Sequence, residues 1–156
     1  MDEREFSRRV RLMRDRLWRV SFSILRSTAD CEDAMQEALL RSWRNVDLLR
    51  DKSLFETWLT RILINECRRL IRKRPEITEI PESLPAPQAE NPELGKKIAS
   101  LKMDLRLPVI LHYIEGYSVK ETASIMKITQ ANVKSRLMRA RKKLKEAIEK
   151  EAAQDE

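Results

Sequence analysis

The sequence predicts an all-α fold: two small helical domains joined by a flexible, acidic, Pro-rich linker, the second domain being a helix-turn-helix. Only 2 of the 156 residues are glycine, too few for hairpin-rich β folds, whose tight turns need residues at positive φ. Apolar residues recur three or four positions apart over most of the chain, which is the spacing of one helical face. Both observations favour helices over strands.

The boundary between the predicted domains lies at residues 75–94. This segment holds five of the six prolines, five acidic residues and no Lys or Arg. Proline lacks a backbone N–H and clashes with the preceding turn, so no regular helix can pass through the segment. We therefore expect a first domain at residues 1–74, an extended linker at 75–94 and a second domain at 95–156.

Three helices are predicted in the first domain. The first has one apolar face, formed by Phe6, Val10, Met13, Leu17, Val20 and Ile24. The second is expected to begin after Asp30 as its N-cap, with an apolar stripe of Met35, Ala38, Leu39, Trp43 and Val46. Ser53 and Glu56 fit a capping box that opens the third helix, which ends against Pro75 and turns inward Trp58, Leu59, Ile62, Leu63 and Leu70.

The second domain has the pattern of a helix-turn-helix. A helix over residues 101–115 is expected to stop at Gly116, and Ser118 with Glu121 forms a second capping box. The short helix that follows ends near Met126. A tight turn then leads to Thr129, the cap of a long last helix whose inward residues are Val133, Leu137, Leu144 and Ile148.

The charge balance and the cysteines restrict the class of protein. The chain has 32 Lys and Arg against 25 Asp and Glu, a net charge of +7, which favours a polyanionic partner. The start is charged rather than apolar, and no apolar stretch is long enough to span a bilayer. Because Cys31, Cys67 and His112 lack metal-ligand spacing, we expect a cytoplasmic chain with reduced, inert thiols, a structural histidine and no metal.

The final helix carries the strongest functional pattern. Residues 134–145 hold seven basic residues and no acid. Such a face fits the major groove, where Arg donates to guanine and the other cations pair with phosphates. A solvated cationic helix is the alternative, but the capped helix and tight turn before it favour DNA binding.

A second basic surface is expected at the end of the first domain, where Arg61, Arg68, Arg69, Arg72, Lys73 and Arg74 follow one another. Thr60 and Asn65 are placed on its polar side, with Lys52, Ser53 and Phe55 near its start. Cations mixed with an aromatic ring and small polar groups suit single-stranded DNA. Phe55 and Trp58 are at helical spacing, however, and fit a core equally well, so both interpretations stay open.

A third surface has mixed charge. The outer side of one helix is expected to carry both acidic and basic residues, namely Asp30, Glu32, Asp33, Gln36, Glu37, Leu40, Arg41 and Arg44. Acidic groups repel DNA, so a protein partner is one interpretation, and an ordinary exposed amphipathic helix is the other.

Three motifs together resemble one known family, the extracytoplasmic-function sigma factors. Residues 30–38 followed by Trp43 look like their core-binding helix, and residues 55–62 with Asn65 look like their −10 region. Residues 113–118 with Glu121 and Ala123, followed by residues 133–137 and 139–141, look like their −35 helix-turn-helix. The likeness covers nearly the whole chain, in the family's order.

The resemblance implies an alternative sigma factor without catalytic chemistry, cofactor or small-molecule substrate. Its partners would be core RNA polymerase, promoter DNA and an anti-sigma factor, often anchored in the membrane. The residues that match the core-binding helix are Asp33, Gln36, Glu37, Leu40 and Arg41. Those that match the single-stranded −10 site are Lys52, Ser53, Phe55, Arg61, Asn65 and Arg68. Those that match the duplex −35 site are Gln130, Asn132, Lys134, Ser135, Arg136, Met138, Arg139 and Lys142.

Three positions depart from the family pattern. Lys102 stands where Pro is common, and Lys127 stands at a turn position often held by Gly, where a left-handed residue would be strained. Pro108 lies inside a predicted helix and should remove a hydrogen bond and bend it, unless the helix begins close to it. The rival interpretations are a stand-alone helix-turn-helix regulator and a helical adaptor protein.

Overall fold

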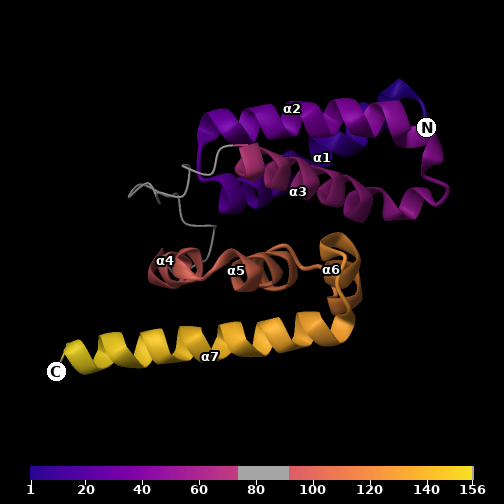
Figure 1. The fold of residues 1–156 in the computed structure, drawn as a ribbon. Helices are drawn as coiled ribbons and strands as arrows, with labels where there is room; N and C mark the ends of the chain where they lie inside the picture. Colours follow the sequence, from indigo (N-terminus) through magenta and orange to yellow (C-terminus); the bar gives the residue numbers. More distant parts are fainter. Residues whose placement is uncertain (74–91, 156) are drawn as a thin grey trace. The chain divides into compact units, whose positions relative to one another are not determined.

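The computed structural model describes residues 1–73 and 92–155 (Figure 1). Every regular element in this part of the chain is a helix or a helical turn, which confirms the all-α prediction. The elements form two compact units, called here the N-terminal unit (residues 1–73) and the C-terminal unit (residues 92–155). Most of the predicted linker, residues 75–91, lies outside the described residues.

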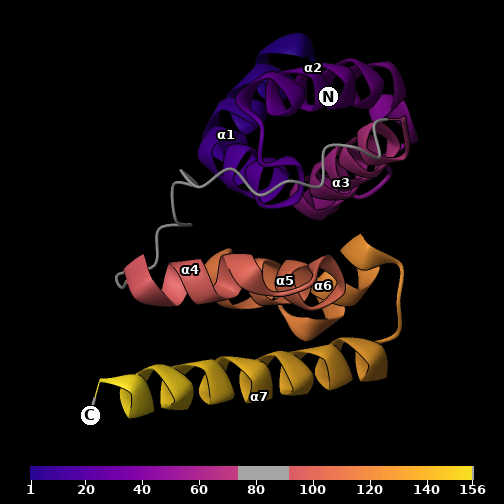
Figure 2. The same ribbon diagram turned by 60° about the vertical axis from the view of Figure 1, so that its left-hand side comes forward.

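The N-terminal unit is a bundle of three helices (Figure 2). They are α1 (Glu3–Leu25), α2 (Thr28–Asn45) and α3 (Phe55–Lys73), with the 3₁₀ turns η1 (Val46–Leu48) and η2 (Lys52–Leu54) between the last two. The predicted face of α1 is buried except for Val10, which is half-buried. Each helix packs against the other two, so one apolar core serves the unit.

Helix α2 differs from its prediction in its start and in its buried face. The N-cap is Ser27, in extended conformation, and its hydroxyl accepts from the amide of Asp30, which lies inside the first turn and is buried. The buried stripe consists of small side chains, which allow close approach to the neighbouring helices: Cys31, Ala34, Ala38 and Ser42. Trp43 remains 41% exposed, with its ring against that of Phe6 at a centroid distance of 5.1 Å.

The predicted capping box at the start of α3 is wrong. Asp51 instead caps the turn η2 that precedes α3, because its carboxylate accepts from the amide of Ser53 at 3.0 Å and from its hydroxyl at 2.6 Å. The Glu56 carboxylate instead pairs with Arg16 of α1 at 2.8 Å. Contacts between helices thus override a local sequence pattern.

The C-terminal unit consists of α4 (Pro92–Ser100), α5 (Met103–Val109), the π-helical segment η3 (Ile110–Ile114), α6 (Val119–Met126) and α7 (Gln130–Gln154). Residues 92–94, predicted as linker, form the first turn of α4, where a proline costs no hydrogen bond. The predicted helix over residues 101–115 is divided instead: α5 begins at Met103 and widens into η3 just after Pro108.

The helix-turn-helix is confirmed in detail. Gly116 has φ of +79°, and Ser118 and Glu121 form the reciprocal capping box at 3.0 Å. Lys127 adopts the strained left-handed conformation at φ of +57°, and the Thr129 hydroxyl caps α7 by accepting from an amide at 3.1 Å.

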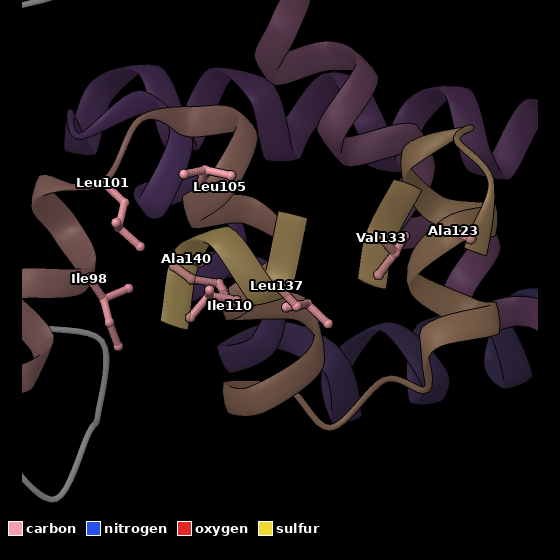
Figure 3. Close-up of a cluster of buried hydrophobic side chains, with 9 residues drawn as sticks. Ile98, Leu101, Leu105, Ile110, Ala123, Val133, Leu137 and Ala140 are labelled. Atoms are coloured by element: carbon pink, nitrogen blue, oxygen red, sulfur yellow. The ribbon is translucent and has the colours of Figure 1, made fainter. Parts of the chain in front are cut away.

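One apolar cluster holds these helices together. Val133, Leu137 and Ala140 of α7 are buried against side chains of α4, α5, η3 and α6 (Figure 3). Leu144 packs at the margin of the cluster. Ile148 is 49% exposed, so its predicted inward position is wrong: α7 runs on past the core.

Replacing Lys127 with glycine should stabilise the C-terminal unit by roughly 0.5–1 kcal/mol. The left-handed conformation costs a residue with a Cβ roughly 1–2 kcal/mol, and the greater chain entropy of glycine removes part of the gain. Hydrogen exchange of the α6 and α7 amides measures the change. Lys143→Gly, at an exposed position in the middle of α7, is the matched control and should lose about 1 kcal/mol. Exchange in Lys127→Gly as fast as in the unaltered chain, or faster, would contradict the strain.

Candidate functional site

The exposed face of α7 gathers most of the residues predicted to contact duplex DNA. Six of the eight are exposed on the side away from the buried stripe: Gln130, Lys134, Ser135, Met138, Arg139 and Lys142. Burial of Val133 and Leu137 leaves this face to solvent. The face combines cations with a hydroxyl and a thioether, groups that can pair with phosphates and touch base edges.

The two remaining residues of that set, Asn132 and Arg136, are half-buried and engaged within the unit. The Arg136 Nε donates to the side-chain oxygen of Asn132 at 2.9 Å, and its Nη1 donates to the carbonyl of Asp104 at 3.3 Å. Arg136 therefore joins α7 to α5, and Asn132 holds the guanidinium from within α7.

The predicted core-binding residues share the outer side of α2. Asp33, Gln36, Leu40 and Arg41 are exposed, and Glu37 is half-buried. Arg41 is tied down by Glu66 of α3 at 2.7 Å and faces Glu37 at 3.7 Å. The face therefore joins acids, an amide and an exposed leucine, a combination suited to a protein surface rather than to phosphates.

The residues predicted to hold single-stranded DNA fall into two groups. Arg61, Asn65 and Arg68 follow one another by four and three positions and so share one stripe of α3, with Asn65 exposed. Lys52 and Ser53 are exposed in the turn η2. Ten residues separate Phe55 from Asn65, which is about 15 Å along a helix, so the two groups form a track rather than one pocket.

Phe55 belongs to the core, which corrects its placement among the DNA contacts. Its side chain is 1% exposed, and its ring lies 5.7 Å from Phe6 and 5.9 Å from Trp58. Of the two interpretations left open by the sequence, the packing one holds. Thr60, expected on the polar side, is likewise fully buried, because it lies on the same side of α3 as Leu63 and Ile64.

A cavity of about 420 Å³ lies between α1 and the turn η2. It is lined by Arg8, Arg9, Leu12, Lys52, Ser53, Phe55 and Glu56. Arg9 braces it, because its guanidinium donates to the Lys52 carbonyl at 2.7 Å and lies 5.6 Å from the centre of the Phe55 ring. Cations around an apolar wall suit a nucleotide, whose base is apolar on its faces and whose phosphate is anionic.

The α1 residues of this cavity were missed by the sequence analysis. Leu12 is 76% exposed among arginines, but a single apolar residue on a charged face is common and does not by itself indicate a binding surface. Arg8 gave no indication either, because its proximity to Lys52 arises only from the packing of α1 beside η2.

The groups with reactive side chains are held in structural positions. Cys31 and Cys67 are buried free thiols, and burial raises the pKa of each above its usual value, so both stay protonated at neutral pH. His112 is half-buried, with its Nδ1 at 2.7 Å from the Tyr117 carbonyl. Hydrogen bonds from Ser53 lower the pKa of Asp51, which keeps that carboxylate ionised beside η2. Within residues 1–73 and 92–155, no cluster of these residue types is arranged to hold a metal ion.

The same ranges contain no helix that is both long and apolar enough to span a membrane.

Comparisons with known proteins agree with the architecture. The family model for sigma-70 region 2 matches residues 10–76, and the model for sigma-70 region 4 matches residues 93–144. An RNA polymerase sigma-E factor of Streptomyces avermitilis is 31% identical over 154 residues, covering 93% of this chain and 86% of that protein. The ECF RNA polymerase sigma-E factor of Escherichia coli K12 is 28% identical over 144 residues, covering 78% and 75%.

A solved structure is similar over both units. It is the sigma factor RpoE of Bartonella quintana in complex with the anti-sigma factor NepR, with a TM-score of 0.80 at 25% identity. The alignment covers 93% of this chain and 97% of that one.

Proposed function

The chain belongs to the extracytoplasmic-function subfamily of sigma-70-type RNA polymerase sigma factors, and we propose that it directs promoter-specific initiation through three separate surfaces. Residues 1–74 act as the region 2 domain, residues 95–156 act as the region 4 domain, and residues 75–94 link them. The observation that carries the proposal is the exposed cationic face of α7, the second helix of a helix-turn-helix in which both helices are capped.

Helix α7 reads the −35 duplex in the major groove. Lys134, Ser135 and Arg139 reach base edges or the nearest phosphates, and Lys142, two turns further along than Ser135, contacts phosphate alone. Arginine can donate two hydrogen bonds to one guanine, which gives direct discrimination, whereas a phosphate contact adds affinity for every sequence equally.

The single-stranded −10 element follows the track along the N-terminal unit. Asn65 and the flanking Arg61 and Arg68 hold one part of the strand, since an amide can pair with a base edge while cations neutralise phosphates. The cavity beside η2 receives an unstacked base against Leu12, with Arg8 and Lys52 near its phosphate. Capture of an unpaired base lowers the free energy of the melted state and so assists melting.

The outer face of α2 docks on core RNA polymerase through Asp33, Gln36, Glu37, Leu40 and Arg41. Its acids keep this face off the DNA, so that each surface selects a different partner. The two DNA contacts are weak separately and act together when the polymerase holds both units on one promoter. As in the solved relative, an anti-sigma factor is the natural partner of the unbound chain.

Gel-shift of a promoter fragment with and without core RNA polymerase tests the proposal. The fragment is first selected by the assembled holoenzyme from a library randomised over both elements. We expect a specific shift only with core polymerase present, because each unit alone binds weakly. A stand-alone regulator would shift the fragment without polymerase, and an adaptor protein would add no specificity in either lane.

Reversing the charge on α2 should weaken docking on the polymerase. Asp33→Lys with Gln36→Lys is expected to lower affinity for core enzyme about tenfold or more, measured by pull-down. The reason is that two positions of the docking surface become cationic and no longer complement the charge of the polymerase surface. Both positions are exposed, so the free energy of unfolding should change by less than about 0.5 kcal/mol. Glu149→Lys with Gln154→Lys adds the same charge at exposed positions of α7 and should leave docking intact. Undiminished capture of the folded Asp33 and Gln36 double variant would refute this docking surface.

Removing the amide of Asn65 should impair promoter melting. Asn65→Ala is expected to leave association with polymerase unchanged and to reduce open complex on duplex promoters by about fivefold, the worth of one hydrogen bond. Permanganate reactivity of the melted thymines measures it, and a pre-melted template is the control. Recovery on the pre-melted template would place Asn65 in the melting step, and an equal loss on both would place it in base contact alone. If neither template is affected, Asn65 lies outside the site.

A further inference from the structure

The junction between α5 and α7 contains a hydrogen bond that Pro108 makes possible. In a regular α-helix the amide of residue 108 would donate to the carbonyl of Asp104. Proline has no amide hydrogen, so this donor is missing inside α5. A side chain from α7 supplies one instead: the Arg136 Nη1 donates to the Asp104 carbonyl at 3.3 Å.

The same guanidinium also fixes the first turns of α7. Its Nε donates to the side-chain oxygen of Asn132 at 2.9 Å, and the amide of Asn132 donates to the Thr129 hydroxyl that caps the helix. One arginine therefore connects the beginning of α7 to the backbone of α5. Its neighbours Lys134 and Ser135 are exposed, whereas Arg136 is half-buried.

We propose that Arg136 is a positioning residue for −35 recognition, which sets how α7 lies against α5 and does not itself contact DNA. The inference rests on the proposed role of α7. Val133 and Leu137 are buried, but the hydrophobic effect that buries them has no preferred direction. Hydrogen bonds from a planar guanidinium are directional, and they add the angular precision that base readout at hydrogen-bond distance requires.

Promoter binding by the chain in complex with core RNA polymerase distinguishes a positioning role of Arg136 from a direct DNA contact. The full chain is bound to core RNA polymerase and presented with promoter fragments randomised over the −35 element, at several salt concentrations. Arg136→Met retains the stem and removes every donor. We expect preference to fall severalfold at more than one base position, with the slope of log affinity against log salt unchanged.

Lys142→Met is the matched control, since it removes one cation from the exposed face. It should make the salt slope shallower by about 0.9, the value for one phosphate contact, without changing base preference. A shallower slope in Arg136→Met would make Arg136 a DNA contact and overturn the proposal, as would an unchanged preference. If the unaltered chain showed no −35 preference, the proposed function would fail instead, so the two failures are distinguishable.

A double-mutant cycle tests the link through Pro108 without DNA. Pro108→Ala restores an amide donor for the Asp104 carbonyl, which makes the bond from Arg136 redundant. Arg136→Met removes the bonds to Asp104 and to Asn132, so in the natural background hydrogen exchange of the α5 and α7 amides should accelerate by about 25-fold, the loss of two hydrogen bonds. In the Pro108→Ala background only the bond to Asn132 is lost without a replacement, and the acceleration should be about fivefold. Equal acceleration in both backgrounds would overturn the link, even if Arg136→Met proved too unstable for the promoter assay.

Discussion

A helix in a small bundle can bury only one of its faces, and this constraint decides where every candidate surface lies. In α7 the buried stripe is Val133, Leu137 and Ala140, so the cations between these positions are forced outward. In α2 the buried stripe is made of small residues, which brings the helix close to its neighbours and leaves its longer side chains in solvent. The surfaces are thus a by-product of core formation, because hydrophobic burial is the dominant favourable term in folding.

These surfaces differ in charge, and the difference suits them to different partners. The net charge of +7 is not spread evenly: residues 134–145 contain no acid, whereas the outer side of α2 contains Asp33 and Glu37. Ion pairs also neutralise some of the cations on the N-terminal unit, since Arg41 pairs with Glu66 and Arg16 with Glu56. A nucleic-acid partner is therefore attracted to some faces and repelled from another, which orients the chain before any specific contact forms.

The sequence predicts well whatever depends on neighbouring residues. The Ser118 capping box, the positive φ of Gly116, the Thr129 cap and the buried face of α1 all follow from local patterns, and all are present. One local feature was wrong, because Ser27 rather than Asp30 caps α2, but other failures involve partners distant in the sequence. Ser53 and Glu56 match a capping box, yet Glu56 bonds to Arg16, forty positions away. The sequence pattern allows Phe55 to face either solvent or the core. Its burial depends on the contact with Phe6 of α1, which lies far away in the sequence.

The candidate site divides in the same way. Exposure of Lys134 and Arg139 follows from the helical period, and could be predicted from the spacing of Val133 and Leu137. The roles of Arg8 and Arg136 could not, because each depends on an element that lies far along the chain but close in space. Lys127 ends α6 in a left-handed conformation just before α7, while Arg136 bonds α7 to the interrupted helix α5. Two independent constraints at the start of one helix determine its orientation, which is what a helix that reads bases needs and what apolar packing alone does not supply.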